Sequence, residues 1–249
     1  MVARLYQRPD AEMVPYTDND LAGLPDPVVR YFRFALTAGQ RRVSRARFDQ
    51  TGEFAMRPGS WKPFTAVESF SVDRPGFLWD ARIRIAGMTA MYVRDGYLAG
   101  EGAMLGTLGA IVPVVNQSGT SQMAAGELVR YLAELVLLPT ALLPGGGVSW
   151  KPLDDKGAEV TLVDGQTTVS CTVDFAERGE IVRMSAMRHM ANDDAPLTRW
   201  VGHFRDYDRV DGMMIPTSAE VAWMLPAGPF PYWRGRMRNV RYDFAPPVA

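Results

Sequence analysis

The 249-residue chain carries 27 basic and 28 acidic side chains, a formal net charge of -1. This balance, without a charged block, argues against nucleic acid or an anionic membrane surface as a partner. A chain of this length can bury roughly 70 to 75% of the surface that its unfolded form exposes, so its core requires no disulfide or metal ion.

The first 20 residues are charged throughout and contain no apolar run typical of a signal peptide. No later stretch approaches the roughly 20 apolar residues that span a bilayer, since Glu134 and Pro139 interrupt the longest candidate, 128–143. We expect an extended segment over 1–22, one domain over 23–249, no integral membrane segment and a cytoplasmic location, unless a leader was removed before residue 1. The oligomeric state is left open.

A first helix is predicted for Asp26 to Leu36. Asp26 suits the N-cap and Pro27 the first helical position, where the missing amide costs little. Gly39 offers a stop beyond it. One face of this helix is apolar, formed by Val28, Tyr31, Phe32 and Ala35.

Most of the remaining sequence alternates between apolar and polar residues with a period of two. The clearest examples are 77–85 and 215–223, and this pattern is typical of strands with one buried face. The dipeptides Asp95-Gly96, Asp164-Gly165 and Asp211-Gly212 predict hairpin turns, which makes the sheet antiparallel. In the last strand the apolar parity changes, which predicts a β-bulge near 238–240.

Glycines at positions 100, 102, 106 and 109 superficially resemble a phosphate-binding loop. The segment follows a predicted hairpin turn and leads into an apolar run, whereas a dinucleotide site needs a strand followed by a helix. We interpret 101–122 as a mobile apolar flap at the mouth of a concavity. The stretch Pro144 to Gly147 is expected to be a loop.

A second helix is predicted for 124–138, with Pro139 ending it. Arg130 and Glu134 stand four residues apart. The favoured interpretation is an exposed pair worth about 0.3 to 0.5 kcal/mol. In the alternative, the helix plugs the concavity, and Tyr131 and Glu134 present a hydroxyl and a carboxylate to an apolar pocket, where burial would raise the pKa of Glu134.

The residues that most often bind metals or act as nucleophiles are sparse. Cys171, the one cysteine, lies in an alternating apolar run and is expected in the core. His189 and His203 have no second ligand-type residue at metal spacing, so no metal site is expected. His203 is interpreted as a satisfied or surface histidine, with a general base as the alternative.

Many one-sided strands with only two helices predict a mainly β (α+β) fold, in which a curved antiparallel sheet forms a half-barrel around two plugging helices. The apolar side is rich in tryptophan and in the 14 methionines, whose flexible thioethers either fill an irregular core or accept ligands of several shapes.

The runs 128–135 and 138–143, with Phe77-Leu78-Trp79-Asp80-Ala81, resemble an uncharacterised bacterial family. The stretch from Phe204 to Thr217 resembles the late hairpin of lipoprotein-carrier half-barrels of the LolA and LolB type. This resemblance implies a curved antiparallel sheet with a hydrophobic cavity, which in the carriers holds lipid acyl chains. A related fold member, the violacein-pathway protein VioE, is an enzyme without an apparent cofactor, so the fold leaves function open.

Three hypotheses follow. The first is a binding module that holds a lipid or other hydrophobic small molecule, without a cofactor or metal, on its concave face. The second is a cofactor-independent enzyme in which Glu134 or His203 transfers a proton on an apolar substrate, and the third is a solid structural domain. No catalytic residue is assigned, and the candidate ligand-binding residues are Trp79, Tyr92, Tyr131, Glu134, Trp200, Phe204 and Trp223.

Overall fold

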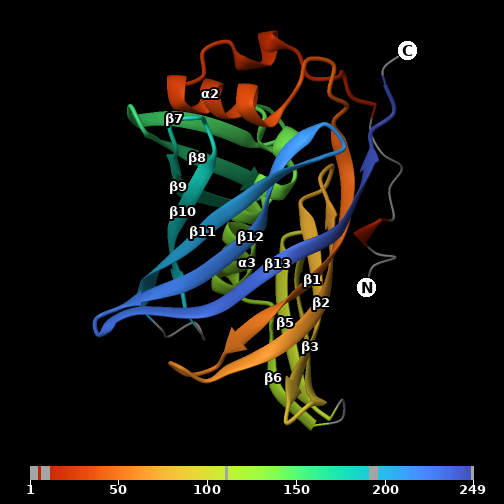
Figure 1. The fold of residues 1–249 in the computed structure, drawn as a ribbon, viewed down its shortest axis with the longest axis vertical. Coiled ribbons are helices and arrows are strands. Elements are labelled where there is room, and N and C mark those ends of the chain that lie inside the picture. Colours follow the sequence, from red (N-terminus) through yellow and green to blue (C-terminus); the bar gives the residue numbers. More distant parts are fainter. Residues whose placement is uncertain (1–4, 7–11, 110–111, 191–195, 248–249) are drawn as a thin grey trace.

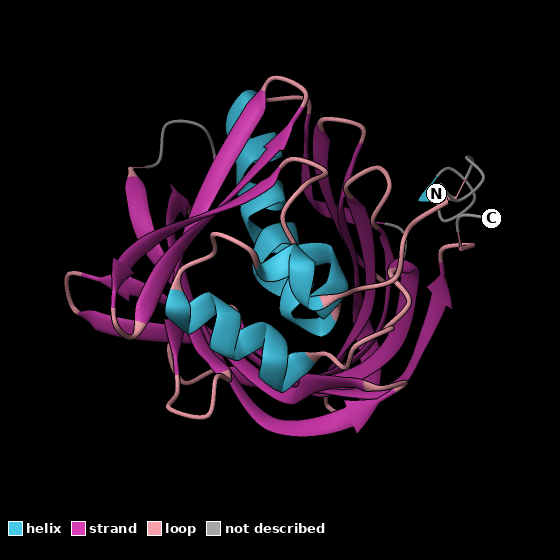
Figure 2. Cartoon of the chain, turned by 90° about the horizontal axis from the view of Figure 1, so that it is seen from above, coloured by secondary structure: helices cyan, strands magenta, loops and turns pink. Residues whose placement is uncertain are grey.

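The computed structural model describes residues 5–6, 12–109, 112–190 and 196–247. These residues form one 13-stranded sheet in which every neighbouring pair of strands is antiparallel. The sheet curls around the helices without closing, as the view from above shows (Figure 2). The predicted half-barrel around plugging helices is therefore confirmed.

The order of the strands explains how the helices come to lie inside. From the centre of the sheet the chain runs outward through β1 to β6, crosses to the opposite edge at β7, and returns inward to β13, which pairs with β1 (Figure 1). The crossing segment contains helix α3, so α3 spans the concave side. The strands are β1 Val43–Ala55, β2 Trp61–Ser71, β3 Gly76–Ile85, β4 Met88–Leu98, β5 Glu101–Leu108, β6 Val112–Ser118, β7 Val148–Asp154, β8 Gly157–Asp164, β9 Thr167–Phe175, β10 Ile181–His189, β11 Leu197–Val210, β12 Met213–Leu225 and β13 Gly228–Phe244.

Both predicted helices form, with small differences at their ends. Helix α2 covers Asp26–Ala35 and buries the predicted apolar face, although Pro25 rather than Asp26 is its N-cap. Helix α3 covers Ser121–Glu134 and begins three residues earlier than predicted, because the Thr120 hydroxyl accepts the amide of Met123 at 3.1 Å. Three short 3-10 helices are also present: η1 Asp18–Leu21, η2 Leu135–Leu137 and η3 Pro139–Leu142.

Two of the three predicted turns are confirmed, at Asp164-Gly165 between β8 and β9 and at Asp211-Gly212 between β11 and β12. The prediction for Asp95-Gly96 is wrong. These residues lie within β4 and pair with β3 and β5 on either side. An Asp-Gly pair favours a turn only where no neighbouring strand requires the backbone to stay extended.

Strands β1 and β13 approach each other closely at the centre of the sheet. Gly52 faces Gly235 there, and a Cβ atom on Gly52 would lie 2.1 Å from the carbonyl oxygen of Arg234. The predicted bulge is confirmed nearby, where the pairing shifts between Arg47 and Asp49 of β1 and Asn239 adopts a φ of 50°. Close backbone contact and a bulge both increase the local coiling of the sheet.

Strand β5 contains the glycines at 102 and 106 and pairs with β6, so no strand-to-helix phosphate loop exists there. The predicted flap over 101–122 is this edge hairpin and the start of α3, and its mobility stays a prediction. Residues 110–111 at the turn of this hairpin lie outside the described residues. The predicted loop at Pro144 to Gly147 is confirmed as the connection from η3 to β7. None of the helices in the described ranges has the length and apolar character needed to traverse a bilayer.

Candidate functional site

A cavity of about 370 Å³ lies between the concave face of the sheet and helix α3. Its walls are mostly apolar, contributed by strands from both halves of the sheet. The third hypothesis, a solid interior, is therefore wrong. The largest apolar lining residues are Trp79, Trp200, Trp223, Trp233, Phe54, Phe204, Phe230, Met56, Met91, Met104, Met190 and Met237.

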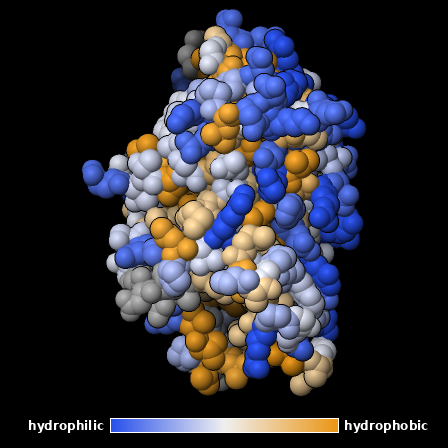
Figure 3. All heavy atoms as spheres, turned by 90° about the vertical axis from the view of Figure 1, so that its left-hand side faces the viewer, coloured by the Kyte–Doolittle hydropathy of each residue, from blue (hydrophilic) through white to orange (hydrophobic). Residues whose placement is uncertain are grey.

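The mouth of this cavity is marked by methionines that belong to both the lining and the outer surface. Met56 is 60% exposed and Met190 is 40% exposed, and both line the cavity. Exposed apolar side chains also lie on β5 and β6, including Leu105, Leu108 and Val114. Figure 3 shows apolar side chains on both sides of a hollow near the lower end of the molecule. An apolar molecule entering there would stay in contact with apolar surface.

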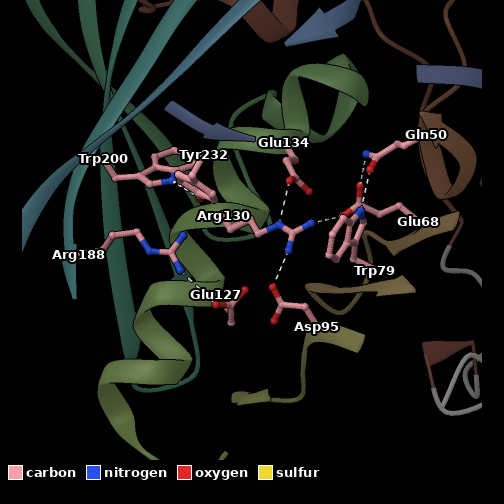
Figure 4. Close-up of polar contacts among 10 residues, drawn as sticks. All are labelled: Gln50, Glu68, Trp79, Asp95, Glu127, Arg130, Glu134, Arg188, Trp200 and Tyr232. Carbon is pink, nitrogen blue, oxygen red and sulfur yellow. Dashed lines mark hydrogen bonds and ion pairs between the residues drawn. The ribbon is translucent and has the colours of Figure 1, made fainter. Parts of the chain in front are cut away.

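One end of the cavity contains an ion network centred on Arg130 (Figure 4). The guanidinium contacts three carboxylates: Nη2 lies 2.8 Å from Glu68, Nη1 lies 2.6 Å from Asp95, and Nε lies 2.9 Å from Glu134. The Arg130–Glu134 pair was favoured as an exposed pair, and that interpretation is wrong. The Arg130 side chain is 15% exposed because helix α3 faces the concavity. The alternative, in which Glu134 faces an apolar pocket, is the arrangement observed.

Glu68 is the most deeply buried member of this network. Its second oxygen accepts a hydrogen bond from Gln50 Nε2 at 2.6 Å, and Gln50 Oε1 accepts one from Trp79 Nε1 at 2.7 Å. The ring of Trp79 also lies 5.3 Å from the Arg130 guanidinium. Because Gln50 links Glu68 to the Trp79 indole, these hydrogen bonds hold the Trp79 ring in position in the cavity wall.

A second arginine lies beside the first. Arg188 on β10 donates from Nη2 to Glu127 on α3 at 3.1 Å. Its guanidinium lies 5.7 Å from the ring of Trp200 and 5.6 Å from that of Trp223, at cation–π distance. We name the six charged residues Glu68, Asp95, Glu127, Arg130, Glu134 and Arg188 the acid–arginine cluster.

The acid–arginine cluster contains four carboxyl groups and two guanidinium groups, so full ionisation would leave a net charge of -2. Burial, and then the neighbouring Asp95, raises the pKa of Glu127 to about 8. Burial, and then the adjacent Glu134 carboxylate, raises the pKa of Glu68. Burial also raises the pKa of Asp95, against the opposing effect of Arg130. The cluster therefore retains protons at neutral pH.

Several polar atoms of the cluster are buried without a hydrogen-bond partner among the described residues. They include Asp95 Oδ1, Glu127 Oε2 and Arg188 Nε, and all three residues line the cavity. Glu134 Oε2 has no such partner either, but Glu134 lies beside the Glu68 carboxyl, and a shared proton would satisfy both. Because an unsatisfied buried polar group costs about 1 to 3 kcal/mol, these atoms are suited to a guest with a polar end.

The structure brings five of the seven predicted ligand-binding residues to the cavity wall. They are Trp79, Glu134, Trp200, Phe204 and Trp223. Tyr131 does not line the cavity, because its hydroxyl donates to the carbonyl of Ser71 at 3.0 Å on another side of α3. Tyr92 does not line it either, since Met91, Val93 and Asp95 of the same strand occupy the inward positions.

The remaining sequence candidates lie away from the cavity. His203 does not line it, since its neighbours Gly202 and Phe204 take the inward positions of β11. Burial and the nearby Arg205 and Arg183 lower the pKa of His203. Cys171 is confirmed as a core residue, and burial raises the pKa of its thiol to about 12. In the part of the chain that the structure describes, no group of histidine, cysteine and acidic side chains is arranged to hold a metal ion.

Sequence reasoning missed most of the acid–arginine cluster, although a signal for it was present. Glu127, Arg130 and Glu134 follow an i, i+3, i+7 spacing that places all three on one helical face. Glu68 and Asp95 occupy inward positions of alternating strands, where an apolar residue is the rule. A charged residue at an inward position is the informative exception.

The model of a family of unknown function, DUF6544, matches residues 14–235 of the chain. The search of curated proteins with this chain found no match. Among solved structures, a LolA superfamily protein from Nitrosomonas europaea is similar at 11% identity and a TM-score of 0.47, over 88% of this chain and 93% of the other. A β-barrel-like protein of the DUF1849 domain family from Brucella abortus is similar at 11% identity and a TM-score of 0.22, over 82% and 99% of the two chains.

Proposed function

This chain belongs to the DUF6544 family of unknown function, and we propose that it binds a hydrophobic small molecule or lipid in the cavity on its concave face. One observation carries the proposal: an apolar hollow of about 370 Å³ is also lined by residues whose buried polar atoms have no hydrogen-bond partner within the described part of the chain. Ligand pockets combine a largely apolar wall with a few polar groups that orient the guest. The cytoplasmic location and the likeness to VioE stay predictions.

The composition of the wall supports a binding role over a structural one. A solid core gains stability from close packing, and a void of this size forfeits those contacts. Two of its tryptophans are held by hydrogen bonds, from Trp79 Nε1 to Gln50 Oε1 at 2.7 Å and from Trp200 Nε1 to the Tyr232 hydroxyl at 3.0 Å. Its methionines are flexible and can adapt to a guest. A rigid aromatic frame with adaptable thioethers suits a bound molecule of irregular shape.

Titration with N-phenyl-1-naphthylamine, a neutral apolar probe whose fluorescence rises out of water, tests this proposal. We expect saturable binding, accompanied by quenching of tryptophan emission. Ala219→Phe adds a ring inside the cavity, because Ala219 lines it from β12. This variant should weaken the probe's affinity about ten-fold or more.

The matched control is Ala22→Phe, which adds the same ring at an exposed position after η1. It should leave the affinity for the probe unchanged. Equal binding by wild type and Ala219→Phe would place the probe elsewhere and contradict the proposal.

A second candidate, a cofactor-independent enzyme acting on an apolar substrate in the same cavity, is favoured by Glu127. Glu127 lines the cavity, its pKa is about 8, and its Oε2 has no hydrogen-bond partner among the described residues. Such a carboxyl group is suited to proton transfer near neutral pH. The sequence hypothesis named Glu134 or His203 for this role, and Glu127 is the better placed. Incubation with the natural ligand, followed by mass analysis, separates the two candidates. If the protein is an enzyme, wild type converts the ligand to a product of different mass or structure, whereas Glu127→Gln leaves the ligand unchanged.

A further inference from the structure

We propose that the cavity selects amphiphiles whose polar end is an ammonium group, held by Asp95 and Glu127, over amphiphiles that end in a carboxylate or phosphate. The inference rests on the proposed function, since it names the ligand class of the same cavity. It follows from the charge balance of the acid–arginine cluster and from the identity of its unpartnered atoms.

Arg130 is already paired with three carboxyl groups. Its Nε, Nη1 and Nη2 each contact a different carboxylate, at distances between 2.6 and 2.9 Å. The three acidic partners also surround it with negative charge. An anionic head group approaching Arg130 would compete with these three carboxyl groups for the guanidinium, and any carboxylate that it displaced would lose its partner in a buried site.

Arg188 is the remaining cation of the cluster. Its Nη2 contacts Glu127, and the rings of Trp200 and Trp223 lie at cation–π distance from its guanidinium. Its Nε is buried, has no hydrogen-bond partner in the part of the chain that the structure describes, and could donate one hydrogen bond to a guest. The cluster has two more carboxyl groups than guanidinium groups, so an anion there would require the additional carboxyl groups to stay protonated.

The unpartnered acceptors favour a cation. Asp95 is 3% exposed and Glu127 is 2% exposed, both residues line the cavity, and each has one oxygen without a hydrogen-bond partner among the described residues. An ammonium group has three donors and a full positive charge, so it can contact both oxygens. Hydrogen bonds between ionised groups are about twice as strong as neutral ones. A hydroxyl group donates once and brings no charge.

Ammonium binding should also release a proton. Glu127 faces Arg188 from β10, Asp95 from β4, and Arg130 and Glu134 from its own helix. With its pKa at about 8, Glu127 is mostly protonated at pH 7 in the empty cavity. A bound ammonium favours the ionised carboxylate, so Glu127 loses its proton as the ligand arrives.

Calorimetric titration at pH 7 with decylamine, 1-decanol and decanoate tests the inference, since these probes share one alkyl chain. An alkylamine is cationic at this pH, as a lysine side chain is. We expect decylamine to bind about ten-fold tighter than 1-decanol, and decanoate to bind weakest. Equal affinity for decylamine and 1-decanol, or preference for decanoate, would overturn the head-group inference alone. Failure of all three probes to bind would overturn the proposed function with it.

Two variants separate the head-group contact from the apolar contact. Glu127→Gln and Asp95→Asn should each reduce the preference for decylamine over 1-decanol about ten-fold, with 1-decanol affinity retained. Glu53→Gln is the matched control, because Glu53 is exposed and pairs with Arg234 on the outer surface. Circular dichroism identifies any variant that does not fold. In that case the other variant and the three wild-type titrations test the preference for decylamine. An unchanged preference in a folded variant would overturn the inference.

Titration in phosphate and in Tris, which differ in enthalpy of ionisation, measures proton exchange directly. Wild type should release up to about one proton for each bound decylamine at pH 7, and none for 1-decanol. Glu127→Gln should abolish the release. Decylamine binding without proton release in wild type would contradict the assigned role of Glu127.

Discussion

The two helices occupy the same curved sheet and do opposite things within it. Helix α2 packs its aromatic side chains against the sheet. The ring of Phe32 lies edge-on to that of Trp150, with centroids 6.3 Å apart, and the ring of Tyr31 lies 6.1 Å from that of Phe175. Helix α3 instead turns Glu127 and Arg130 toward a hollow. The side chains on the inward face of each helix therefore decide whether the half-barrel is filled or left open.

This difference separates stability from ligand binding along the molecule. At α2 the inward face is apolar, so close packing excludes both water and guests. At α3 the charged residues pair with Glu68 of β2, Asp95 of β4 and Arg188 of β10, and the cavity lies beside these pairs. Substitutions at α2 should change stability alone, whereas those at α3 should change stability, pH dependence and binding together.

Removing Arg130 should have the largest effect. Arg130→Met keeps much of the side-chain volume but leaves Glu68, Asp95 and Glu134 without their shared cation. Breaking a buried ion pair by removing one partner costs about 3 to 5 kcal/mol. Urea unfolding followed by circular dichroism measures the loss.

Arg94→Met is the matched control for this experiment. Arg94 pairs with Asp80 at 2.7 Å, but both side chains are more than 40% exposed. Its loss should lower the free energy of unfolding by at most about 1 kcal/mol. Equal losses of unfolding free energy at the two positions would contradict the claim that the ion pairs of Arg130 contribute more than an exposed pair does.

The pH dependence of stability should depend on Glu127. Its pKa is about 8 in the folded chain and near 4.5 when unfolded, so between these pH values the folded state keeps a proton that the unfolded state has lost. The free energy of unfolding therefore falls as pH rises across this window, by up to about 1.4 kcal/mol per pH unit, and the contribution is fully present below pH 4.5.

Glu127→Gln should remove this contribution, so the variant gains stability relative to wild type as pH rises from 5 to 8. Urea unfolding at several pH values checks the trend, with Glu53→Gln as the exposed control. Parallel pH profiles for Glu127→Gln and wild type would contradict the assignment.

The smallest expected effect compares one tyrosine on each helix. The Tyr31 hydroxyl of α2 is buried without a partner among the described residues, whereas the Tyr131 hydroxyl of α3 donates to Ser71. Tyr31→Phe should be neutral or stabilise by about 1 kcal/mol, and Tyr131→Phe should destabilise by about 1 kcal/mol. Thermal unfolding of the two variants side by side measures the difference, and a larger loss from Tyr31→Phe would mean that its hydroxyl has a partner.

Much of the fold follows from local patterns in the sequence. The period of two predicts strands such as β3, and Pro27 with the apolar face predicts α2, because these signals depend on neighbouring residues only. The bulge near Asn239 was predictable because a change of parity within one strand has few other causes. The position of Asp95 in the middle of a strand was not, since pairing on both sides overrides the turn preference of Asp-Gly.

The candidate site was predictable only in part. The aromatic wall follows from inward parity, which identified Trp79, Trp200 and Trp223. The pairing of Arg130 with Glu68 and Asp95 depends on β2, β4 and α3 meeting across 62 and 35 residues of sequence. Their inward positions mark Glu68 and Asp95 as unusual, but such separations leave no local pattern that identifies Arg130 as their partner.

Native mass spectrometry of protein purified from its own host tests the central claim most directly. The account predicts a fraction of wild-type molecules with an additional small-molecule mass, which disappears in Ala219→Phe and persists in Ala22→Phe. Wild-type protein that carries no added mass and also fails to bind N-phenyl-1-naphthylamine would contradict it.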